Sequence, residues 1–429
     1  MALVTRWNLL FFGMLVFAAL SVPLSAEAAE SLQKQIDELP SGGKLVLDSG
    51  VYKESLLITK PITIEGSDGT IITQCSDEPV MTIIGAKVTI KNLQVVSCSK
   101  AEGTAAISVK GVNHTLENIM ITASQFGIKL NEAHSTTISN LEISGEGKAN
   151  GIDLWKSSDN LITNTVIDHV YDGIYLEDSH DNRLIDNKVT HARYGYHLMF
   201  SNGTELKGNH SSENTTGAMI MSTRDTVVEN NQLLENNENV NAQGLLLYDT
   251  YKAKISHNII SNNRVGLFLD TSNQNLIENN VVTQNFIGMQ LREFHENVIR
   301  DNSMIGNVYD SQAINSQDNQ IQGNYWDSSL KLDTAGNGTS IIPYTSDPYF
   351  LTITNSTPEF QLFFHAPGML VLQKLLKSHE EALLRDDTPR MTAATEIERV
   401  SHSPYPLWLV SLAMIFGSLV YFVWGRKAL

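Results

Sequence analysis

The chain has 429 residues and a formal net charge of −17, with 18% charged and 42% hydrophobic residues. This composition excludes a largely disordered chain and a bundle made only of membrane helices. The acidic balance argues against nucleic-acid binding, which requires basic surfaces. The length suits one large elongated domain or two ordinary ones, and two cysteines are too few for a disulfide framework.

The first 29 residues predict a secretory signal peptide. Arg6 is the only charged residue before an apolar run at 9–20, and small residues follow in SVPLSAEAAE (21–30). Cleavage near residues 26–29 fits a small-x-small site. An uncleaved anchor is the less favoured alternative, because Pro23 and the Ala-rich stretch after it are typical of a processed segment.

A repeat of about 22 residues organises residues 30–326. One of its columns is rich in asparagine and follows an aliphatic residue two or three places earlier. We expect this column to form ladders that turn the corners of a stacked fold. Its members are Asn118, Asn140, Asn164, Asn187, Asn209, Asn230, Asn258, Asn279 and Asn324, with Asp301 in the one slot without asparagine.

A second column lies midway between the asparagines, where a glycine precedes a short apolar run, as in NGIDL (150–154) and DGIYL (172–176). The first and third positions after this glycine are apolar, so strands with these positions facing inward are predicted. The first positions are Ile128, Ile152, Ile174, Tyr196, Ala218, Leu245, Leu267 and Met289. The third positions are Leu130, Leu154, Leu176, Leu198, Ile220, Leu247, Leu269 and Leu291.

Together the two columns predict an all-β fold, a right-handed parallel β-helix of about ten coils with three short strands per coil. Cys75 and Cys98 are 23 residues apart, so they fall in one column of adjacent coils. Strands about 4.8 Å apart place them within range of a disulfide. A pair of buried thiols is equally favoured, and a role in copper binding is a weaker third interpretation.

The outward positions between these columns carry the candidate metal ligands. The second position after the glycine is His197 in one coil and Met219 in the next, and the fourth is Met199 and then Met221. Imidazole and thioether groups on one rigid sheet are donors that suit Cu(I), a soft ion. The alternative is that these side chains cover an exposed sheet or a protein contact. A slip of one residue in the register would bury all four.

Two other groups of polar residues have competing interpretations. His169 and His191 share a column, and we favour polar turn residues over a metal site. On the same face as His197 lies an acidic and aromatic group comprising Asp153, Trp155, Tyr175, Glu177 and Asp178. Paired carboxylates can perform acid–base chemistry on polysaccharides or hold Ca²⁺. Such catalysis is disfavoured, because the cations that would neutralise a uronate, Lys129, Lys156 and Arg292, are widely spread.

Beyond Trp326 the repeat stops, and residues 327–403 predict a closing loop, an amphipathic helix at 368–387 and a linker. Residues 404–425 predict a transmembrane helix, because they contain about the 20 uncharged residues that a bilayer span needs and carry aromatic residues near both ends. Arg426 and Lys427 follow at once. The tail 426–429 is therefore expected in the cytoplasm and the body on the opposite side of the membrane. A buried core helix is the less favoured alternative.

Three stretches resemble the NosD family of accessory proteins for nitrous oxide reductase maturation. They are GNYWDSSLKLDTAGNGTSIIPY (323–344), the repeat YDGIYLEDSHDNRLIDNKV (171–189) and FHAPGMLVLQKLLKSHEEALLRDDTPRM (364–391), which ends in Asp-x-x-Pro-x-Met. The resemblance covers nearly the whole mature chain. The repeats alone are weakly specific, since carbohydrate-active β-helix proteins have similar ones.

The resemblance implies a periplasmic, non-enzymatic protein that works with an ABC transporter, NosF and NosY. Under this resemblance the predicted C-terminal helix would anchor the protein to the inner membrane, beside that transporter. Such a protein would receive copper from the lipoprotein NosL and support copper-centre assembly in nitrous oxide reductase, with His197 and the three methionines as the natural Cu(I) patch. The competing function is a cell-surface β-helix that binds or modifies polysaccharides. The sequence departs from the family in its closing loop, which has lost most of the acidic residues that would favour Ca²⁺, and in its C-terminal membrane span.

Overall fold

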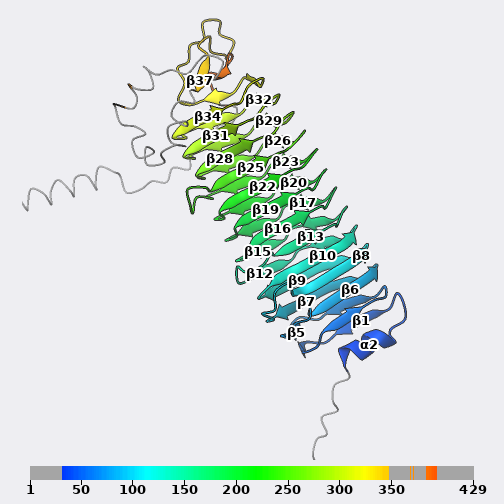
Figure 1. Ribbon diagram of the computed structural model, residues 1–429. Helices are drawn as coiled ribbons and strands as arrows, with labels where there is room; N and C mark the ends of the chain where they lie inside the picture. The colour runs from blue at the N-terminus through cyan, green and yellow to red at the C-terminus, as the bar shows by residue number, and fades with distance from the viewer. Residues whose placement is uncertain (1–30, 347–367, 369–370, 372–382, 394–429) are drawn as a thin grey trace, which may run out of the picture.

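The computed structural model describes residues 31–346, 368, 371 and 383–393 (Figure 1). Within that part of the chain no helix is both long and apolar enough to cross a membrane. The predicted signal peptide, membrane span and cytoplasmic tail lie outside the described residues, so these three assignments stay predictions. The described chain begins with one short helix, α2 (Leu32–Glu38), which buries Leu32 and Ile36 against the first coil.

The chain forms a rod of stacked coils, as predicted, and the strands of each coil pair in parallel with the equivalent strands of the next coil (Figure 1). One face, called here the front sheet, takes one strand from each of twelve complete coils. Its strands are β3 (Leu56–Ile58), β6 (Met81–Ala86), β8 (Ala105–Val112), β10 (Phe126–His134), β13 (Ile152–Trp155), β16 (Asp172–Glu177), β19 (Tyr194–Met199), β22 (Thr216–Met221), β25 (Gln243–Tyr248), β28 (Val265–Asp270), β31 (Ile287–Arg292) and β34 (Tyr309–Ile314).

The other two faces join through the long strands β7 (Thr89–Ser97) and β9 (Thr115–Ala123), which pass through the bend between them. One face holds β1 (Lys44–Leu47), β4 (Thr63–Gly66), β11 (Thr137–Ser139), β14 (Leu161–Thr163), β17 (Arg183–Ile185), β20 (Glu205–Lys207), β23 (Val227–Glu229), β26 (Lys254–Ser256), β29 (Leu276–Glu278), β32 (Val298–Arg300) and β35 (Gln320–Gln322). The other holds β2 (Gly50–Tyr52), β5 (Thr70–Gln74), β12 (Glu142–Ser144), β15 (Val166–Asp168), β18 (Lys188–Thr190), β21 (His210–Ser212), β24 (Gln232–Leu234), β27 (Ile259–Ser261), β30 (Val281–Thr283), β33 (Ser303–Ile305) and β36 (Tyr325–Trp326).

The number of coils exceeds the prediction of about ten, because twelve are complete and β35 and β36 begin another. The coils before Phe126 lack the pattern of a glycine followed by apolar residues, so this pattern could not be used to count them. The predicted inward positions are confirmed. All sixteen side chains of the two apolar columns are buried in one continuous core, with Tyr196 among the largest. Alternation of period two therefore fixed the faces of the strands correctly.

The asparagine ladders are real, but the predicted column mixes two neighbouring positions. Six members of the predicted column adopt left-handed backbone, with φ of 50–59°, namely Asn118, Asn140, Asn164, Asn230, Asn279 and Asp301. The buried ladder lies one position later and comprises Asn187, Asn209, Asn231, Asn258, Asn280, Asn302 and Asn324. In each step an asparagine side-chain oxygen accepts the backbone N–H and the side-chain N–H of the asparagine one coil earlier, as from Asn280 to Asn302.

Cys75 and Cys98 form a disulfide, with Cα atoms 4.6 Å apart. The pairing joins the end of β5 to the end of β7, in adjacent coils. This outcome selects the bridged interpretation over the pair of free thiols, and it removes the cysteines as candidate copper ligands.

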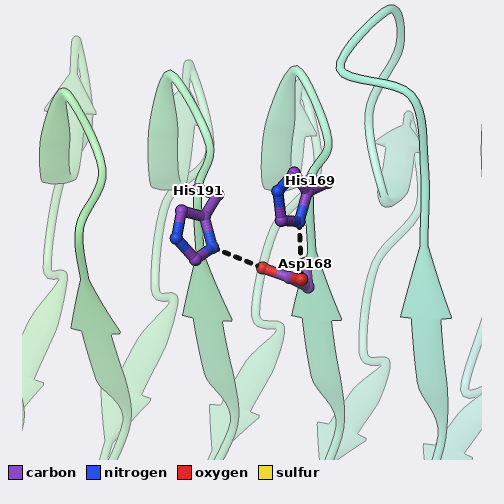
Figure 2. Close-up of side chains that lie close together, drawn as sticks. All are labelled: Asp168, His169 and His191. Carbon is purple, nitrogen blue, oxygen red and sulfur yellow. Dashed lines mark hydrogen bonds and ion pairs between the residues drawn. The ribbon is translucent and has the colours of Figure 1, made fainter.

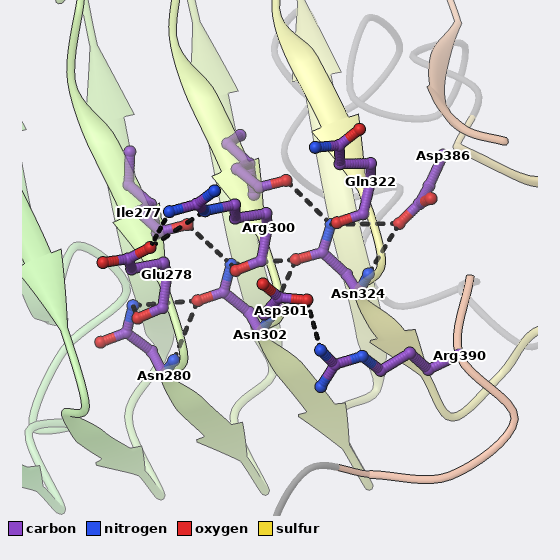
Figure 3. A network of polar contacts seen from close by, with 11 residues as sticks. Ile277, Glu278, Asn280, Arg300, Asp301, Asn302, Gln322, Asn324, Asp386 and Arg390 are labelled. Atoms are coloured by element: carbon purple, nitrogen blue, oxygen red, sulfur yellow. Dashed lines mark hydrogen bonds and ion pairs between the residues drawn. The ribbon is translucent and has the colours of Figure 1, made fainter. Parts of the chain in front are cut away.

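The last coil is closed by a segment 60 residues further along the chain (Figure 3). The carboxylate of Asp386, which is fully buried, accepts the backbone N–H and the side-chain N–H of Asn324, each at 3.0 Å. Asp386 thus occupies the place that the next asparagine takes in every earlier step of the ladder. Its Oδ2 also accepts the indole N–H of Trp326 at 3.0 Å.

Asp386 lies in β38 (Leu384–Asp386), which pairs antiparallel with β37 (Tyr344–Ser346). The predicted amphipathic helix at 368–387 is therefore wrong at its C-terminal end, where the buried acceptor and the strand pairing hold the chain extended. Gly368 and Val371 are helical, and the remainder of that helix lies outside the described residues. Residue 391 ends the Asp-x-x-Pro-x-Met stretch, whose first member is the capping Asp386.

Candidate functional site

The front sheet brings the four predicted metal ligands together in register. His197 and Met199 lie on β19, and their partners on β22 are Met219 and Met221. The alternate residues of these strands fill the core, so the four side chains project from the opposite side of the sheet. We call these four residues the His–Met patch.

His197 was predicted to be an exposed ligand, but it is only 5% exposed. The three methionines of the patch are half-buried. Its ring packs between Tyr175 of the preceding coil, at a centroid distance of 4.9 Å, and Tyr194 of its own strand, at 4.8 Å. Aromatic neighbours on both sides exclude water and fix the ring. The expectation of an open patch is thus wrong for its histidine, although the register is as predicted.

Asp172, at the start of β16, fixes the orientation of this histidine. Its Oδ2 lies 2.8 Å from Nδ1 of His197 and 2.7 Å from a guanidinium nitrogen of Arg193. Burial by itself raises the pKa of Asp172, but the hydrogen bonds from His197 and Arg193 prevail and hold the pKa below its usual range. An ionised carboxylate can only accept, so the proton on the imidazole lies on Nδ1.

The other ring nitrogen, Nε2 of His197, is buried and has no hydrogen-bond partner among the described residues. A buried polar atom without a partner costs about 1–3 kcal/mol, so such an atom calls for an explanation. When the ring is neutral and its proton is on Nδ1, its lone pair lies at Nε2. A histidine whose second nitrogen donates to a carboxylate is the arrangement found around metal-binding histidines.

Tyr175 connects the His–Met patch to the acidic group on the coil before it. Its hydroxyl donates to Glu177 at 2.8 Å and lies 3.5 Å from the sulfur of Met199. Burial and the bond to Glu177 raise the pKa of Tyr175, so the phenol stays neutral. Of the acidic and aromatic residues, Asp153 pairs in register with Tyr175, and Trp155 pairs with Glu177, as predicted.

Of the three predicted cations, Lys129 pairs in register with Asp153, from the preceding coil. Lys156 lies over the ring of Trp155, with its nitrogen 4.3 Å from the centroid. Lys129 lies over Phe126 in the same way, at 4.5 Å. Arg292 forms an ion pair with the buried Asp270, several coils away. The structure therefore does not bring these three cations together around Asp153 and Glu177.

His169 and His191 lie at another corner, directly after β15 and β18, and both have left-handed backbone, with φ of 53° and 52°. Their backbone is that of turn residues, as favoured from the sequence, and this conformation is compatible with either role of the rings. Sequence reasoning missed their neighbour Asp168, and it missed Asp172 and Arg193 beside His197. One signal was available for Asp172: its column otherwise holds aromatic, apolar or neutral polar residues, among them Tyr194, Thr216 and Val265.

Two family models match the chain. Residues 144–343 match the family described as "Periplasmic copper-binding protein (NosD)", and this range includes the entire His–Met patch. Residues 60–195 match the family described as "Right handed beta helix region". No curated protein matches the chain.

Solved structures share the fold at low identity. The pre-mature gene product 12 of bacteriophage phi29 has a TM-score of 0.53 and 12% identity, covering 65% of this chain and 48% of that one. The A-module of the mannuronan C-5 epimerase AlgE4 from Azotobacter vinelandii has a TM-score of 0.46 and 16% identity, covering 66% and 91%. A family 28 exopolygalacturonase from Yersinia enterocolitica has a TM-score of 0.48 and 10% identity, covering 70% and 75%. At such identities the likeness concerns the fold alone.

Proposed function

Since the chain belongs to the NosD family, we propose that it handles copper in the periplasm and binds Cu(I) at the His–Met patch. The family is described as periplasmic and copper-binding, and the matched residues include all four proposed ligands. Copper is here the cargo of the protein and is passed on.

The observation that carries this proposal is the buried, unpartnered Nε2 of His197, with Met219 in register on the adjacent coil. Thioether sulfur and neutral imidazole are soft and borderline ligands that favour Cu(I) over hard ions such as Mg²⁺ or Ca²⁺. Asp172 orients the ring, and the tyrosines on either side of it exclude water. A half-buried site on a rigid sheet can receive and release an ion without refolding.

We further place the protein beside an ABC transporter, NosF and NosY, with NosL as copper donor and nitrous oxide reductase as client. Family membership supports these partners, and the predicted anchor at 404–425 would hold the β-helix close to the transporter. Tethering raises the effective concentration of one partner near another. In this role the protein carries and presents copper and has no catalysis of its own.

The direct test is a Cu(I) titration of the full-length protein against a competing chelator. The wild type is compared with a variant that carries His197→Ala, Met199→Ala, Met219→Ala and Met221→Ala. Met120→Ala is a matched control, because Met120 is an exposed methionine on β9, outside the patch. Binding that is lost in the quadruple variant and kept in the control supports the site. Equal binding by all three proteins contradicts it, provided circular dichroism shows that each is folded.

A second experiment tests the role in assembly. Cells that produce nitrous oxide reductase receive either the wild type or the quadruple variant, and the copper content of the purified reductase is measured. We expect less copper in the reductase made with the variant. A full copper complement in both cases would separate the patch from reductase maturation, even if the purified protein binds copper.

One observation favours the alternative, a β-helix that acts on polysaccharides. Burial raises the pKa of Asp153, whereas hydrogen bonds lower that of Asp172, and opposite shifts of two carboxylates are typical of acid–base pairs. The neighbouring cations are engaged with aromatic rings, which weakens this interpretation. Turnover of a uronate polymer by the wild type, abolished by Asp153→Asn, would establish it.

A further inference from the structure

A second group of metal-ligating side chains gathers at the corner that follows β15 and β18 (Figure 2). The carboxylate of Asp168 lies between two imidazoles. One oxygen is 2.6 Å from Nδ1 of His169, and the other is 2.7 Å from Nδ1 of His191. The two rings stack with their centroids 4.6 Å apart, because the residues occupy the same place in adjacent coils. One ligand atom from each of the three residues fits within 4.8 Å of the others.

Neighbouring side chains orient this group. Thr190 donates its hydroxyl proton to Asp168 at 2.7 Å. Glu213, one coil further on, lies 3.2 Å from Nε2 of His191. In the metal-free protein both ring nitrogens of His191 face carboxylates, Nδ1 facing Asp168 and Nε2 facing Glu213. An ion that binds at Nδ1 therefore takes the place of the proton on that nitrogen, while Glu213 holds the proton on Nε2. Outer carboxylates of this kind commonly support metal-binding histidines.

The charges at this corner also favour a cation. Asp168 and Glu213 provide two negative charges. The side chains of His169, His191 and Asp168 are 64%, 42% and 39% exposed, so an ion can reach them directly from solvent.

We propose that Asp168, His169 and His191 form a second metal site, for a divalent transition-metal ion such as Zn²⁺ or Cu²⁺. Two imidazoles and one carboxylate are ligands that suit these ions, and three protein ligands leave a position open for water or an incoming group. Among divalent ions of the first row, Cu²⁺ is expected to bind most tightly. The site contains no sulfur, so its preference differs from that of the His–Met patch.

The site shares one coil with the His–Met patch. The coil of β15 and β16 carries Asp168, His169 and Asp172, and the coil of β18 and β19 carries His191 and His197. Two sites with different donors on neighbouring coils would let this protein discriminate between a soft monovalent ion and a borderline divalent one. The second site does not depend on the patch being a copper site, because the two share no ligand.

The test uses Zn²⁺ titration of the full-length protein by calorimetry, with His169→Asn and His191→Asn. Asparagine tolerates the left-handed backbone at both positions, so the turns are retained while the ring nitrogens are removed. His257→Asn is the matched control, since His257 also has left-handed backbone (φ 58°) but lies outside the cluster. We expect Zn²⁺ affinity to fall at least about tenfold in each test variant and to be unchanged in the control.

Further measurements separate the outcomes. The electron paramagnetic resonance spectrum of bound Cu²⁺ should show coupling to two nitrogens in the wild type and to one in either variant. Glu213→Gln keeps all three ligands and should weaken Zn²⁺ binding by a smaller factor. The quadruple variant of the His–Met patch should bind Zn²⁺ like the wild type. The proposal would be overturned if the wild type did not bind Zn²⁺, or if both histidine variants bound Zn²⁺ as tightly as the wild type, and either result would leave the Cu(I) patch untouched.

Discussion

Asp172 and His197 form a buried pair that joins two adjacent coils, with Oδ2 of the carboxylate 2.8 Å from Nδ1 of the imidazole. Both side chains are less than a tenth exposed. The bond determines which nitrogen of His197 carries the proton, and therefore which one is available to copper. Asp172 is thus a positioning residue for the proposed Cu(I) site, although it does not itself contact the metal.

Replacing this carboxylate should weaken copper binding without removing a ligand. In Asp172→Asn, the neutral amide holds the imidazole less firmly, and we expect the Cu(I) affinity to fall about tenfold. The measurement is the competitive Cu(I) titration. Asp153→Asn serves as control, because Asp153 bonds to Asn150 and not to His197. If Asp172→Asn binds Cu(I) as tightly as the wild type, the carboxylate has no positioning role.

Two adjacent asparagines should differ sharply in their contribution to stability. Asn280→Ala removes an amide that donates to Ile255 and Asn302 and accepts from Asn258. The loss strands several buried polar groups, so we expect a cost of about 3 kcal/mol or more in the free energy of unfolding. Asn279→Gly keeps the left-handed backbone and should change the free energy of unfolding by less than about 0.5 kcal/mol. Urea denaturation distinguishes the two, and equal effects would mean that the ladder contributes little.

The cap on the last coil provides a third prediction. Asp386→Ala leaves the two N–H groups of Asn324 and the indole N–H of Trp326 without their acceptor. We expect the last coil to lose about 3 kcal/mol of protection against local unfolding. Hydrogen exchange at Asn324 and the fluorescence of Trp326 report on this coil. Asp387→Ala is the matched control, since that neighbour is exposed and pairs only with Arg385 among the described residues.

The closing loop should keep its structure at unusually low pH. The N–H of Gly338, helped by those of Gly336, Asn337 and Ala335, holds the pKa of Asp333 below its ordinary value. A lowered pKa in the folded state means that the carboxylate contributes stability above its unfolded pKa of about 3.9. That contribution is lost only as the pH falls through the lower, folded value.

Amide exchange at Gly336 and Gly338 measures this effect. Protection should persist when the pH is lowered through about 3.9 and should disappear only below it. In Asp333→Asn the same amides should be weakly protected at every pH. A midpoint at or above the ordinary pKa would contradict the assignment. Both oxygens of Asp333 accept backbone N–H groups of the loop.

The sequence predicted the features that recur from coil to coil. Period-two alternation identified the core residues such as Leu198 and Ile220, and constant spacing placed Met219 beside His197. The position of the asparagine ladder was wrong by one residue at several corners. Asn230 precedes Asn231 and Asn279 precedes Asn280, so either member of each pair continues the same spacing.

Features that occur once could not be read from the repeat. Asp172 has no equivalent in neighbouring coils, and its contact with His197 depends on rotamers and on the tyrosines around the ring. Asp386 contacts Asn324, which lies 62 residues earlier in the chain, and no repeat spacing predicts this contact. A histidine expected to be exposed was found buried for the same reason. The residue types that recur at equivalent positions of the repeat do not predict how one particular side chain packs.

The cap at Asn324 also bears on how one molecule meets another. A stack of parallel coils has an open edge at each end, and an uncovered edge can recruit strands from a second chain. Here α2 packs on the first coil, and Asp386 fills the hydrogen-bonding position at which a further coil would otherwise add. The segment around Asp386 completes the hydrogen bonds of the last coil and also ends the stack of coils. We therefore expect this carboxylate at one end and the seven-residue helix at the other to oppose growth of the rods into end-to-end fibres.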